Sequence, residues 1–394
     1  MPNAVQVYLK KGEEQRIVQG HPWVYSNEIL TTNGSVKTGM LVHVFDFKHQ
    51  FIGQGVINPQ SKIRVRLLTW KMEEVIDASL IRKKVFQAIE RRKKIVPDIF
   101  KGGLRLIFSE SDGLPGITAD AYEGHVVIAC MSAGMRVFLD EIVQALKECH
   151  FKSIFEKSVG DICRKEGMPE IQRWWTHEQS FPYRFLEGQA MLDIFPDQGH
   201  KTGFYLDYRS ARQRILPFCK NKKVFEGFCY EGALAIQAAL EGAQVIGWDT
   251  SDRALNQARA NAQLNGVESQ IQFERRDSFK EIKKDVFSEH FGIVILDPPP
   301  LAKSVHDLPQ ASLALQQLIE ASLTFLEPGG ILMISTCSFH FSWLILETTI
   351  QQALSHMQRR FQLLDRIMQP LDHPSLISIP ETEYLRTLLL KEVD

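Results

Sequence analysis

The chain has 394 residues, of which 44% are apolar, and its formal net charge is −1 at pH 7. This length is long for one domain, and the apolar fraction is ordinary for a soluble globular protein. No uninterrupted apolar run approaches the roughly 18 residues that a membrane-spanning helix needs. The near-zero net charge argues against a chain that coats nucleic acid non-specifically.

The first residues and the cysteines indicate a reducing compartment. The segment MPNAVQVYLKKGEEQ has no hydrophobic signal core. The six cysteines form neither a CxxC pair nor a zinc-binding spacing, so no metal site is expected. We therefore expect free thiols and a cytoplasmic protein.

Three compositional regions predict three domains. Residues 1–72 contain the short β-like runs GMLVHVFDF, FIGQGVIN and SKIRVRLLTW, a spacing that favours a small barrel. Residues 73–183 begin with a basic helix and continue into a hairpin around Gly113–Gly116, further strands and a helix near 136–149. In residues 184–394, strands alternate with helices of ten or more residues, which is typical of an α/β domain with a parallel sheet.

Basic residues are concentrated near the N-terminus. Residues 1–100 hold 16 Lys and Arg against 9 Asp and Glu, a local net charge of +7. The densest run is RKKVFQAIERRKK, residues Arg82 to Lys94. As a helix, it would place Val85, Phe86 and Ile89 close to one face and spread most of its charges over the others. The charged side is either a solvated helix surface or a face that contacts phosphates.

The third region predicts a nucleoside-cofactor site. The stretch KKVFEGFCYEGALAIQAALEGA reads as a strand, a tight turn and a helix beginning near Ala233. The next strand, QVIGWD, ends at Asp249, and Thr250 and Ser251 cap a helix that runs to Leu264. A glycine turn lets backbone N–H groups approach a ligand at a helix N-terminus. An acid at the end of the second strand can accept both ribose hydroxyls of a nucleoside.

The glycine pattern favours S-adenosyl-L-methionine over a dinucleotide. Gly227 to Gly232 reads GFCYEG rather than GxGxxG, and the carboxylate of Glu226 would repel a pyrophosphate. A carboxylate there suits the cationic amino-acid end of S-adenosylmethionine. Asp277 follows a third strand in IQFERRDSF, where it could meet the adenine amino group.

Two further strands are expected to bring an acid and a thiol beside this cofactor. The fourth strand, FGIVILD, ends on Asp297, and the three prolines 298–300 make the following loop rigid. The fifth strand, GGILMIST, leads to Cys337. A cysteine after an apolar strand is commonly buried packing, but here a polar loop, CSFHFS, begins at it.

The chain resembles the RlmI-like family of 23S rRNA cytosine-5 methyltransferases over close to its full length. The matching stretches include KKGEEQRIVQGHPWVYSNEI, INPQSKIRVRLL, ESDGLPGITADAY, RKEGMP, GHKTGFYLDYR, EGFCYEG, LDPPPLAKS, TCS and DHPSLISIPETEYLR. The resemblance implies an N-terminal PUA-like β-barrel, a middle α+β domain and a class I methyltransferase domain. The last is Rossmann-like, with a mostly parallel seven-stranded sheet.

The resemblance also implies a reaction and its residues. It implies methylation of carbon 5 of a cytosine in 23S rRNA or a pre-ribosomal particle, with Cys337 as the covalent nucleophile and Asp297 beside the base. A homodimer is left open. The implied cofactor-binding residues are Lys201, Thr202, Asp207, Arg209, Glu226, Phe228, Cys229, Gly232, Asp249, Thr250, Ser251, Asp277, Ser278 and Asp297.

Some features depart from the family pattern or leave alternatives open. Leu301 stands where the family usually has Phe, which leaves the target nucleotide open, and the prolyl loop carries no helper cysteine. The base that removes the carbon 5 proton is water, Asp297 or His340. Rival functions are methylation of an RNA base amino group and a non-catalytic role in RNA binding or assembly.

In the barrel, the expected RNA contacts are arginines, and a nearby aromatic motif is expected to serve packing. The candidate phosphate contacts are Arg16, Arg64 and Arg66. The motif His21-Pro22-Trp23 is expected to pack between domains rather than to stack on a base.

Overall fold

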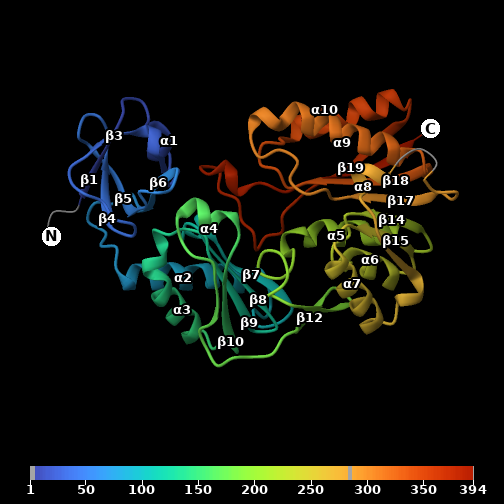
Figure 1. The fold of residues 1–394 in the computed structure, drawn as a ribbon, viewed down its shortest axis with the longest axis horizontal. Coiled ribbons are helices and arrows are strands. Elements are labelled where there is room, and N and C mark those ends of the chain that lie inside the picture. Colours follow the sequence, from blue (N-terminus) through green and yellow to red (C-terminus); the bar gives the residue numbers. More distant parts are fainter. Residues whose placement is uncertain (1–4, 283–285, 394) are drawn as a thin grey trace. The chain divides into compact units, whose positions relative to one another are not determined.

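The computed structural model describes residues 5–282 and 286–393, and the chain divides into two compact units (Figure 1). Unit 1 comprises Met1–Phe185, Ile194–Leu206 and Leu371–Thr382; unit 2 comprises Leu186–Asp193, Asp207–Pro370 and Glu383–Asp394. Within the described ranges, none of the helices combines the length and apolar character that a membrane crossing requires. The division into domains 1–72, 73–183 and 184–394 stays a prediction.

The first sheet of unit 1 has six strands in the order β2-β6-β5-β4-β1-β3. The elements of this part of the chain are β1 (Val5–Leu9), α1 (Gln15–Val18), β2 (Trp23–Tyr25), β3 (Ile29–Thr32), β4 (Leu41–Phe45), β5 (Phe51–Ile57) and β6 (Ile63–Thr69). The three β-like runs of the sequence are β4, β5 and β6, as predicted. Alternate residues such as Val7, Val42 and Val44 are buried in a core on one face of the sheet.

The second sheet of unit 1 has five strands in the order β11-β10-β9-β8-β7. The elements of this part are α2 (Ala78–Lys93), β7 (Gly103–Phe108), β8 (Ile117–Tyr122), β9 (His125–Cys130), α3 (Leu139–Glu148), β10 (Ser153–Ser158), α4 (Asp161–Glu166) and β11 (Ile171–Trp174). The carboxylate of Asp77 caps α2 by accepting the Leu80 N–H over 2.9 Å. The predicted hairpin around Gly113–Gly116 is confirmed, because β7 pairs with β8 in antiparallel fashion.

Two of the arginines that were candidates for RNA contacts are buried instead. Arg92, on the basic helix α2, is 1% exposed, and its Nη1 lies 2.7 Å from the Asp112 carboxylate. Arg66 of β6 is 5% exposed and pairs with the buried Glu166 over 3.2 Å. The expectation of a phosphate contact is therefore wrong for Arg66 and for the Arg92 part of the helix, because both guanidinium groups already have buried acidic partners.

The aromatic motif of the barrel packs, as predicted. The His21 ring is buried, with Nε2 3.1 Å from the Glu381 carboxylate. The Trp23 indole donates its N–H to Glu110 over 2.9 Å. Both partners belong to unit 1.

Unit 2 contains a seven-stranded sheet in the order β16-β15-β14-β17-β18-β20-β19. Its strands are β14 (Lys223–Gly227), β15 (Gln244–Asp249), β16 (Ile271–Arg275), β17 (Phe291–Leu296), β18 (Leu326–Thr336), β19 (Arg360–Met368) and β20 (Arg386–Val393). The first five are parallel to one another, and β20 is antiparallel to both neighbours. This is the mostly parallel, Rossmann-like sheet that the sequence predicts.

Helices cover both faces of this sheet (Figure 1). They are α5 (Arg209–Ile215), α6 (Ala233–Leu240), α7 (Asp252–Leu264), α8 (Ser278–Glu281), α9 (Leu308–Leu323) and α10 (Trp343–His356). Helices α9 and α10 pack together on one face, and α6 and α7 lie on the other. All six residues of β17 are buried, as a strand with both faces covered requires. The short strands β12 (Tyr183–Glu187) and β13 (Ala190–Ile194) form a separate two-stranded sheet.

Candidate cofactor and catalytic site

The turn after β14 has an unusual backbone conformation at the N-terminus of α6. Phe228, Tyr230 and Gly232 all have positive φ angles, of 69°, 49° and 72°. A side chain at Gly232 would place its Cβ 2.6 Å from the Phe273 ring, so only glycine fits at this start of α6. The Cys229 N–H donates to the Trp248 carbonyl over 2.9 Å, which fastens the turn to β15.

Asp249 lies at the end of β15 and is held by two backbone groups. Its Oδ2 accepts the Tyr230 N–H and its Oδ1 accepts the Ser251 N–H, each over 2.9 Å. Each carboxylate oxygen has a further lone pair, so the group can still accept hydroxyl donors. Ser251 also caps α7 by accepting the Ala254 N–H over 3.2 Å, as predicted, while the neighbouring Thr250 is exposed.

Glu226, near the end of β14, is a buried acid with spare acceptor capacity. It is 6% exposed, and its Oε2 has no hydrogen-bond partner among the described residues. Burial, and next the nearby Asp297 carboxylate, raise the pKa of Glu226 to about 8. A cationic ligand could donate a hydrogen bond to Oε2 of Glu226 and offset the repulsion between Glu226 and Asp297. The amino-acid end of S-adenosylmethionine fits that requirement.

The third strand is followed by Asp277 and Ser278. The Asp277 carboxylate caps the short helix α8 and accepts the Phe279 N–H over 3.1 Å. A hydrogen bond from the Lys280 ammonium lowers the pKa of Asp277, so this carboxylate is ionised at neutral pH. The Arg276 N–H donates to the Asp249 carbonyl over 3.0 Å, which ties the ends of β16 and β15 together.

Asp297 and Cys337 follow the neighbouring parallel strands β17 and β18. Leu296, the last residue of β17, is in register with Ile334 of β18. Asp297 comes directly after β17 and Cys337 directly after β18, and both are half-buried. Adjacent parallel strands therefore deliver the acid and the thiol to the same edge of the sheet.

The other cysteines of unit 2 are buried. Burial raises the pKa of Cys219 to about 12 and that of Cys229 well above its ordinary value. Both are therefore protonated at neutral pH. Cys337 is thus the one described cysteine of unit 2 that is accessible to a substrate.

Tyr208 is a neighbour of the site that the sequence analysis missed. Its hydroxyl shares a 2.8 Å hydrogen bond with Ser335 of β18, and the tyrosine is buried. Burial raises its pKa well above the ordinary value, and the charges of Asp297 and Glu226 raise it further. The stretch GHKTGFYLDYR contained this residue, but a tyrosine between Asp207 and Arg209 carries no pattern of its own.

The predicted cofactor residues of that stretch fall in both units. In unit 1, the Thr202 hydroxyl bonds Asp120 and lies 3.2 Å from the Tyr122 hydroxyl, and the Lys201 ammonium lies 4.5 Å from the centroid of the Tyr205 ring. In unit 2, Asp207 accepts the Tyr384 hydroxyl over 2.6 Å, and Arg209 lies 3.5 Å from the Glu187 carboxylate. A role of Lys201, Thr202, Asp207 and Arg209 in cofactor binding stays a prediction.

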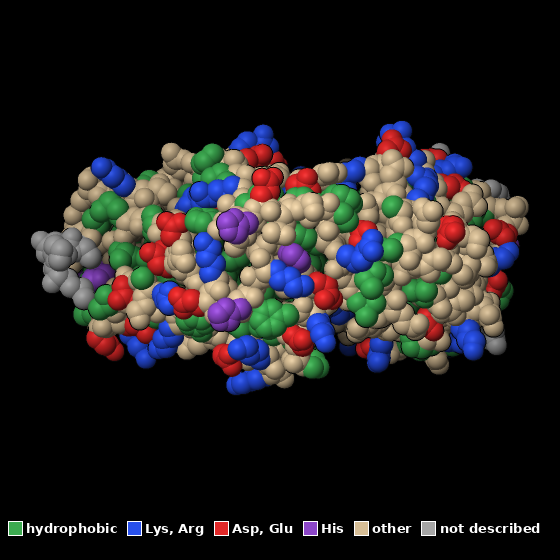
Figure 2. Space-filling view, turned by 90° about the horizontal axis from the view of Figure 1, so that it is seen from below, with side chains coloured by type: hydrophobic (Ala, Val, Ile, Leu, Met, Phe, Trp, Pro, Cys, Tyr) green, Lys and Arg blue, Asp and Glu red, His purple; other side chains and the backbone are tan. Residues whose placement is uncertain are grey.

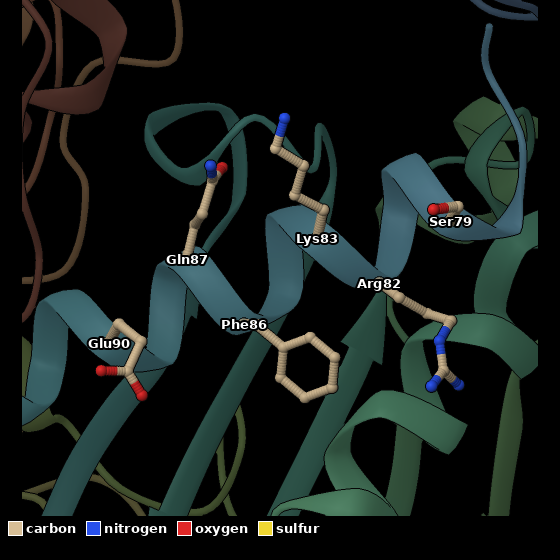
Figure 3. A pocket seen from close by; sticks show the side chains of 6 residues that line it. All are labelled: Ser79, Arg82, Lys83, Phe86, Gln87 and Glu90. Atoms are coloured by element: carbon tan, nitrogen blue, oxygen red, sulfur yellow. The ribbon is translucent and has the colours of Figure 1, made fainter.

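A cavity of about 610 Å³ lies elsewhere, on the surface of α2. Figure 3 shows that its lining side chains diverge: Arg82 and Phe86 point to one side of the helix, and Lys83 and Gln87 point to the other. Arg82 is also engaged by Glu148 over 2.6 Å. Because no group of polar atoms converges there, we assign no site to this cavity.

Comparisons with known proteins identify the two kinds of domain and the fold. The families described as "PUA-like domain" and "Methyltransferase domain" match residues 7–70 and 219–376. A candidate SAM-dependent methyltransferase from Streptococcus mutans superposes with a TM-score of 0.84 at 21% identity, covering 98% of this chain and 99% of that one. A candidate methyltransferase solved in complex with SAH gives a TM-score of 0.85, with the same identity and coverage. The fold and the acids at the strand ends define a class I S-adenosylmethionine-dependent methyltransferase.

Relatives in sequence narrow the class to a family. The ribosomal RNA large subunit methyltransferase I of Photobacterium profundum is 34% identical over 388 residues, which are 96% of this chain and 97% of the relative. The chain therefore belongs to the ribosomal RNA large subunit methyltransferase I family. The predicted fold class, cofactor and enzyme class are confirmed.

Proposed function

We propose that this protein methylates carbon 5 of a cytosine in large-subunit ribosomal RNA through a covalent bond between Cys337 and the base. The rRNA substrate is proposed from the name of the relatives. The observation that supports this chemistry is the position of Asp297 and Cys337. Both are half-buried, and each directly follows one of two adjacent parallel strands.

The acids at the strand ends would hold the cofactor. Asp249 would accept the ribose hydroxyls, Glu226 would face the cationic amino-acid end, and Asp277 would accept the adenine amino group. When bound, S-adenosylmethionine supplies an electrophilic methyl group on a sulfonium centre. Phe228, Cys229 and Gly232 would contribute the turn that approaches it.

Cys337 makes the base reactive. Carbon 5 of cytosine is a poor nucleophile, but addition of the Cys337 thiolate to carbon 6 converts the ring into an enamine whose carbon 5 can take a methyl group. Asp297 would hydrogen-bond ring nitrogen 3 and the exocyclic amine, where electron density collects, and so stabilise the adduct.

The adduct must then resolve. A base removes the proton from carbon 5, the ring electrons re-form the double bond between carbons 5 and 6, and the Sγ–carbon 6 bond breaks to release Cys337. Asp297 and the half-buried His340, three residues after Cys337, are the candidate bases in the chain, and water is the third.

Unit 1 would bind the surrounding RNA, because its N-terminal sheet matches the PUA-like family. The target base has to leave any stack to reach the site, so the bound segment must be single-stranded or opened locally. Figure 2 shows Lys and Arg interspersed with Asp and Glu on the face in view.

Analysis of the methylated product tests the proposal. Large-subunit rRNA from cells without the gene is incubated with the protein and isotope-labelled S-adenosylmethionine, digested to nucleosides and separated by mass spectrometry. We expect the label in 5-methylcytidine. Label in a cytidine or adenosine methylated on its amino group would contradict the proposal and favour an amino-group methyltransferase with Asp297 as the main catalytic residue.

A further inference from the structure

A row of aromatic side chains lies on the first sheet of unit 1, on the face opposite its core. Tyr8 of β1 is in register with Phe45 of β4, and Phe45 is in register with Phe51 of β5. All three are half-buried, whereas their strand neighbours Val7 and Val44 point into the core. Side chains alternate between the faces of a strand, so the three rings form one row across three hydrogen-bonded strands.

The rings of this row contact one another. The Tyr8 and Phe45 rings are stacked, with centroids 5.5 Å apart and planes inclined by 28°. The Phe45 and Phe51 rings meet edge to face at 5.9 Å. The rings of His49 and His43 extend the row, 4.6 Å from Tyr8 and 5.9 Å from Phe51. The result is a rigid aromatic platform that is partly open to solvent.

The turn after β4 is positively charged, and the ring of its His49 contacts Tyr8 of the platform. Phe47, in the turn after β4, has the ammonium groups of Lys11 and Lys48 at 5.9 and 5.5 Å from its ring centroid, and both lysines are exposed. The acid of this turn, Asp46, is buried, and its Oδ1 accepts two backbone N–H groups over 2.8 Å.

On the face of the sheet that bears the platform, neither β1 nor β4 carries an acidic side chain. The other side chains of β1 and β4 on that face are Gln6, Leu41 and His43. The charges beside the platform therefore complement an anionic ligand.

We propose that this platform, formed by Tyr8, Phe45 and Phe51 with Lys11 and Lys48, binds a single-stranded stretch of RNA by stacking its bases. Aromatic rings stack on any unpaired base, and lysines beside them neutralise the phosphates that follow. A fully paired helix hides the faces of its bases and cannot use such a surface. The inference rests on the proposed function, because it assumes an RNA substrate.

RNA binding to the full-length protein without cofactor tests the inference. The probes are a fluorescein-labelled single-stranded RNA of mixed sequence and a labelled hairpin of the same composition. Phe45→Leu removes the ring but keeps apolar bulk, and we expect it to weaken binding of the single strand about tenfold, since stacking contributes about 1–3 kcal/mol per base. Phe45→Tyr keeps an aromatic ring at this position and is expected to bind the single strand as tightly as the unaltered protein does.

Two further variants separate stacking from charge and from general damage. The first is a double variant, Lys11→Gln with Lys48→Gln. Both lysines are exposed, and the substitutions leave the aromatic rings in place. The double variant should reduce the slope of log affinity against log salt by about 1.4, because each contact to a single strand contributes roughly 0.7. Phe218→Leu, at an exposed phenylalanine of unit 2, is the matched control and should leave RNA affinity unchanged.

The failures are distinguishable. If the unaltered protein binds the single strand and neither Phe45→Leu nor the double lysine variant changes that binding, the platform is not an RNA site, while the proposed function stands. If the unaltered protein binds neither RNA, the platform is not an RNA site, and the analysis of the methylated product decides the proposed function separately. Equal weakening of single strand and hairpin by Phe45→Leu would also overturn base stacking.

Discussion

The Ala302 backbone N–H donates a hydrogen bond to the Ser338 hydroxyl over 3.3 Å. This contact ties the prolyl loop after Asp297 to the loop that begins at Cys337. The acid and the thiol thus stand on loops that are fastened to each other as well as to adjacent strands. A pair held in this way is suited to act on one base, because small shifts of either group are costly to catalysis.

Loss of this tie should affect catalysis more than cofactor binding. Ser338 is buried, and Ser338→Ala should lower the free energy of unfolding by about 1 kcal/mol, the usual contribution of one hydrogen bond. We expect kcat to fall while the Kd for S-adenosylmethionine stays the same. Ser355→Ala, at an exposed position of α10, is the control. An unchanged kcat in Ser338→Ala would show that the tie does not position the reacting groups.

Asp249 should be required for cofactor affinity. Asp249→Ala removes the acceptor proposed for the ribose hydroxyls and the partner of two backbone N–H groups. Calorimetry should show at least a tenfold loss of S-adenosylmethionine affinity, which is about 1.4 kcal/mol or more. Asp252→Ala removes a nearby exposed acid at the start of α7 and should bind normally. Equal affinities in the two variants would contradict the assignment.

Glu226 should make stability depend on pH in the absence of cofactor. Its pKa rises from the ordinary 4.5 to about 8 in the folded protein, so the folded state holds the proton more tightly than the unfolded state. This contribution to stability is fully present below pH 4.5 and is lost as pH rises through about 8. Comparison of unfolding free energies should show that Glu226→Gln removes this part of the decline. Identical pH profiles would contradict the raised pKa.

Cofactor binding should then release a proton from Glu226. A cationic group beside this carboxylate favours its ionised form. At about pH 6.5, below the raised pKa, calorimetry in two buffers of different ionisation enthalpy should count more protons released by the unaltered protein than by Glu226→Gln. Equal proton release would place the cationic end of the cofactor away from Glu226.

The cationic residues of the basic helix α2 should differ in their contribution to stability, because some are buried and others are exposed. Arg92 is enclosed by Asp112, the Arg105 carbonyl at 2.9 Å and the Asp372 carbonyl at 2.9 Å. Arg92→Gln should therefore destabilise the protein by about 3 kcal/mol, as expected when a buried charge pair is broken. Lys94→Gln, at an exposed position two residues later, should change stability by less than about 0.5 kcal/mol. Urea unfolding of both variants measures the contrast, and equal small effects would refute the structural role of Arg92.

The sequence could predict the frame of the site because its determinants are local. The apolar runs that became β15 and β18 end at Asp249 and Thr336, as the pattern indicated, and β17 ends at Leu296, one residue before the predicted Asp297. Helix α6 begins at Ala233, as predicted from the strand, turn and helix pattern of that stretch.

Long-range partners could not be predicted in this way. Arg92 reads as one more surface charge of a basic helix, and its burial depends on Asp372, a residue 280 positions along the chain. Tyr208 belongs to the site only because β18 places Ser335 beside its hydroxyl. The segment Leu371–Thr382 belongs to unit 1, although it lies in the sequence between two strands of unit 2. Patterns of spacing carry no information about such partners.

The most direct test of the covalent bond between Cys337 and the base is trapping on RNA that carries 5-fluorocytosine at the target position. Fluorine at carbon 5 cannot leave as a proton, so the bond between Cys337 and carbon 6 should persist after methyl transfer. We predict a denaturation-resistant complex of protein and RNA. Cys337→Ala should lose both the complex and methyl transfer while keeping S-adenosylmethionine affinity, and Cys229→Ala should still form the complex. A Cys337→Ala protein that still methylates RNA would contradict the covalent mechanism.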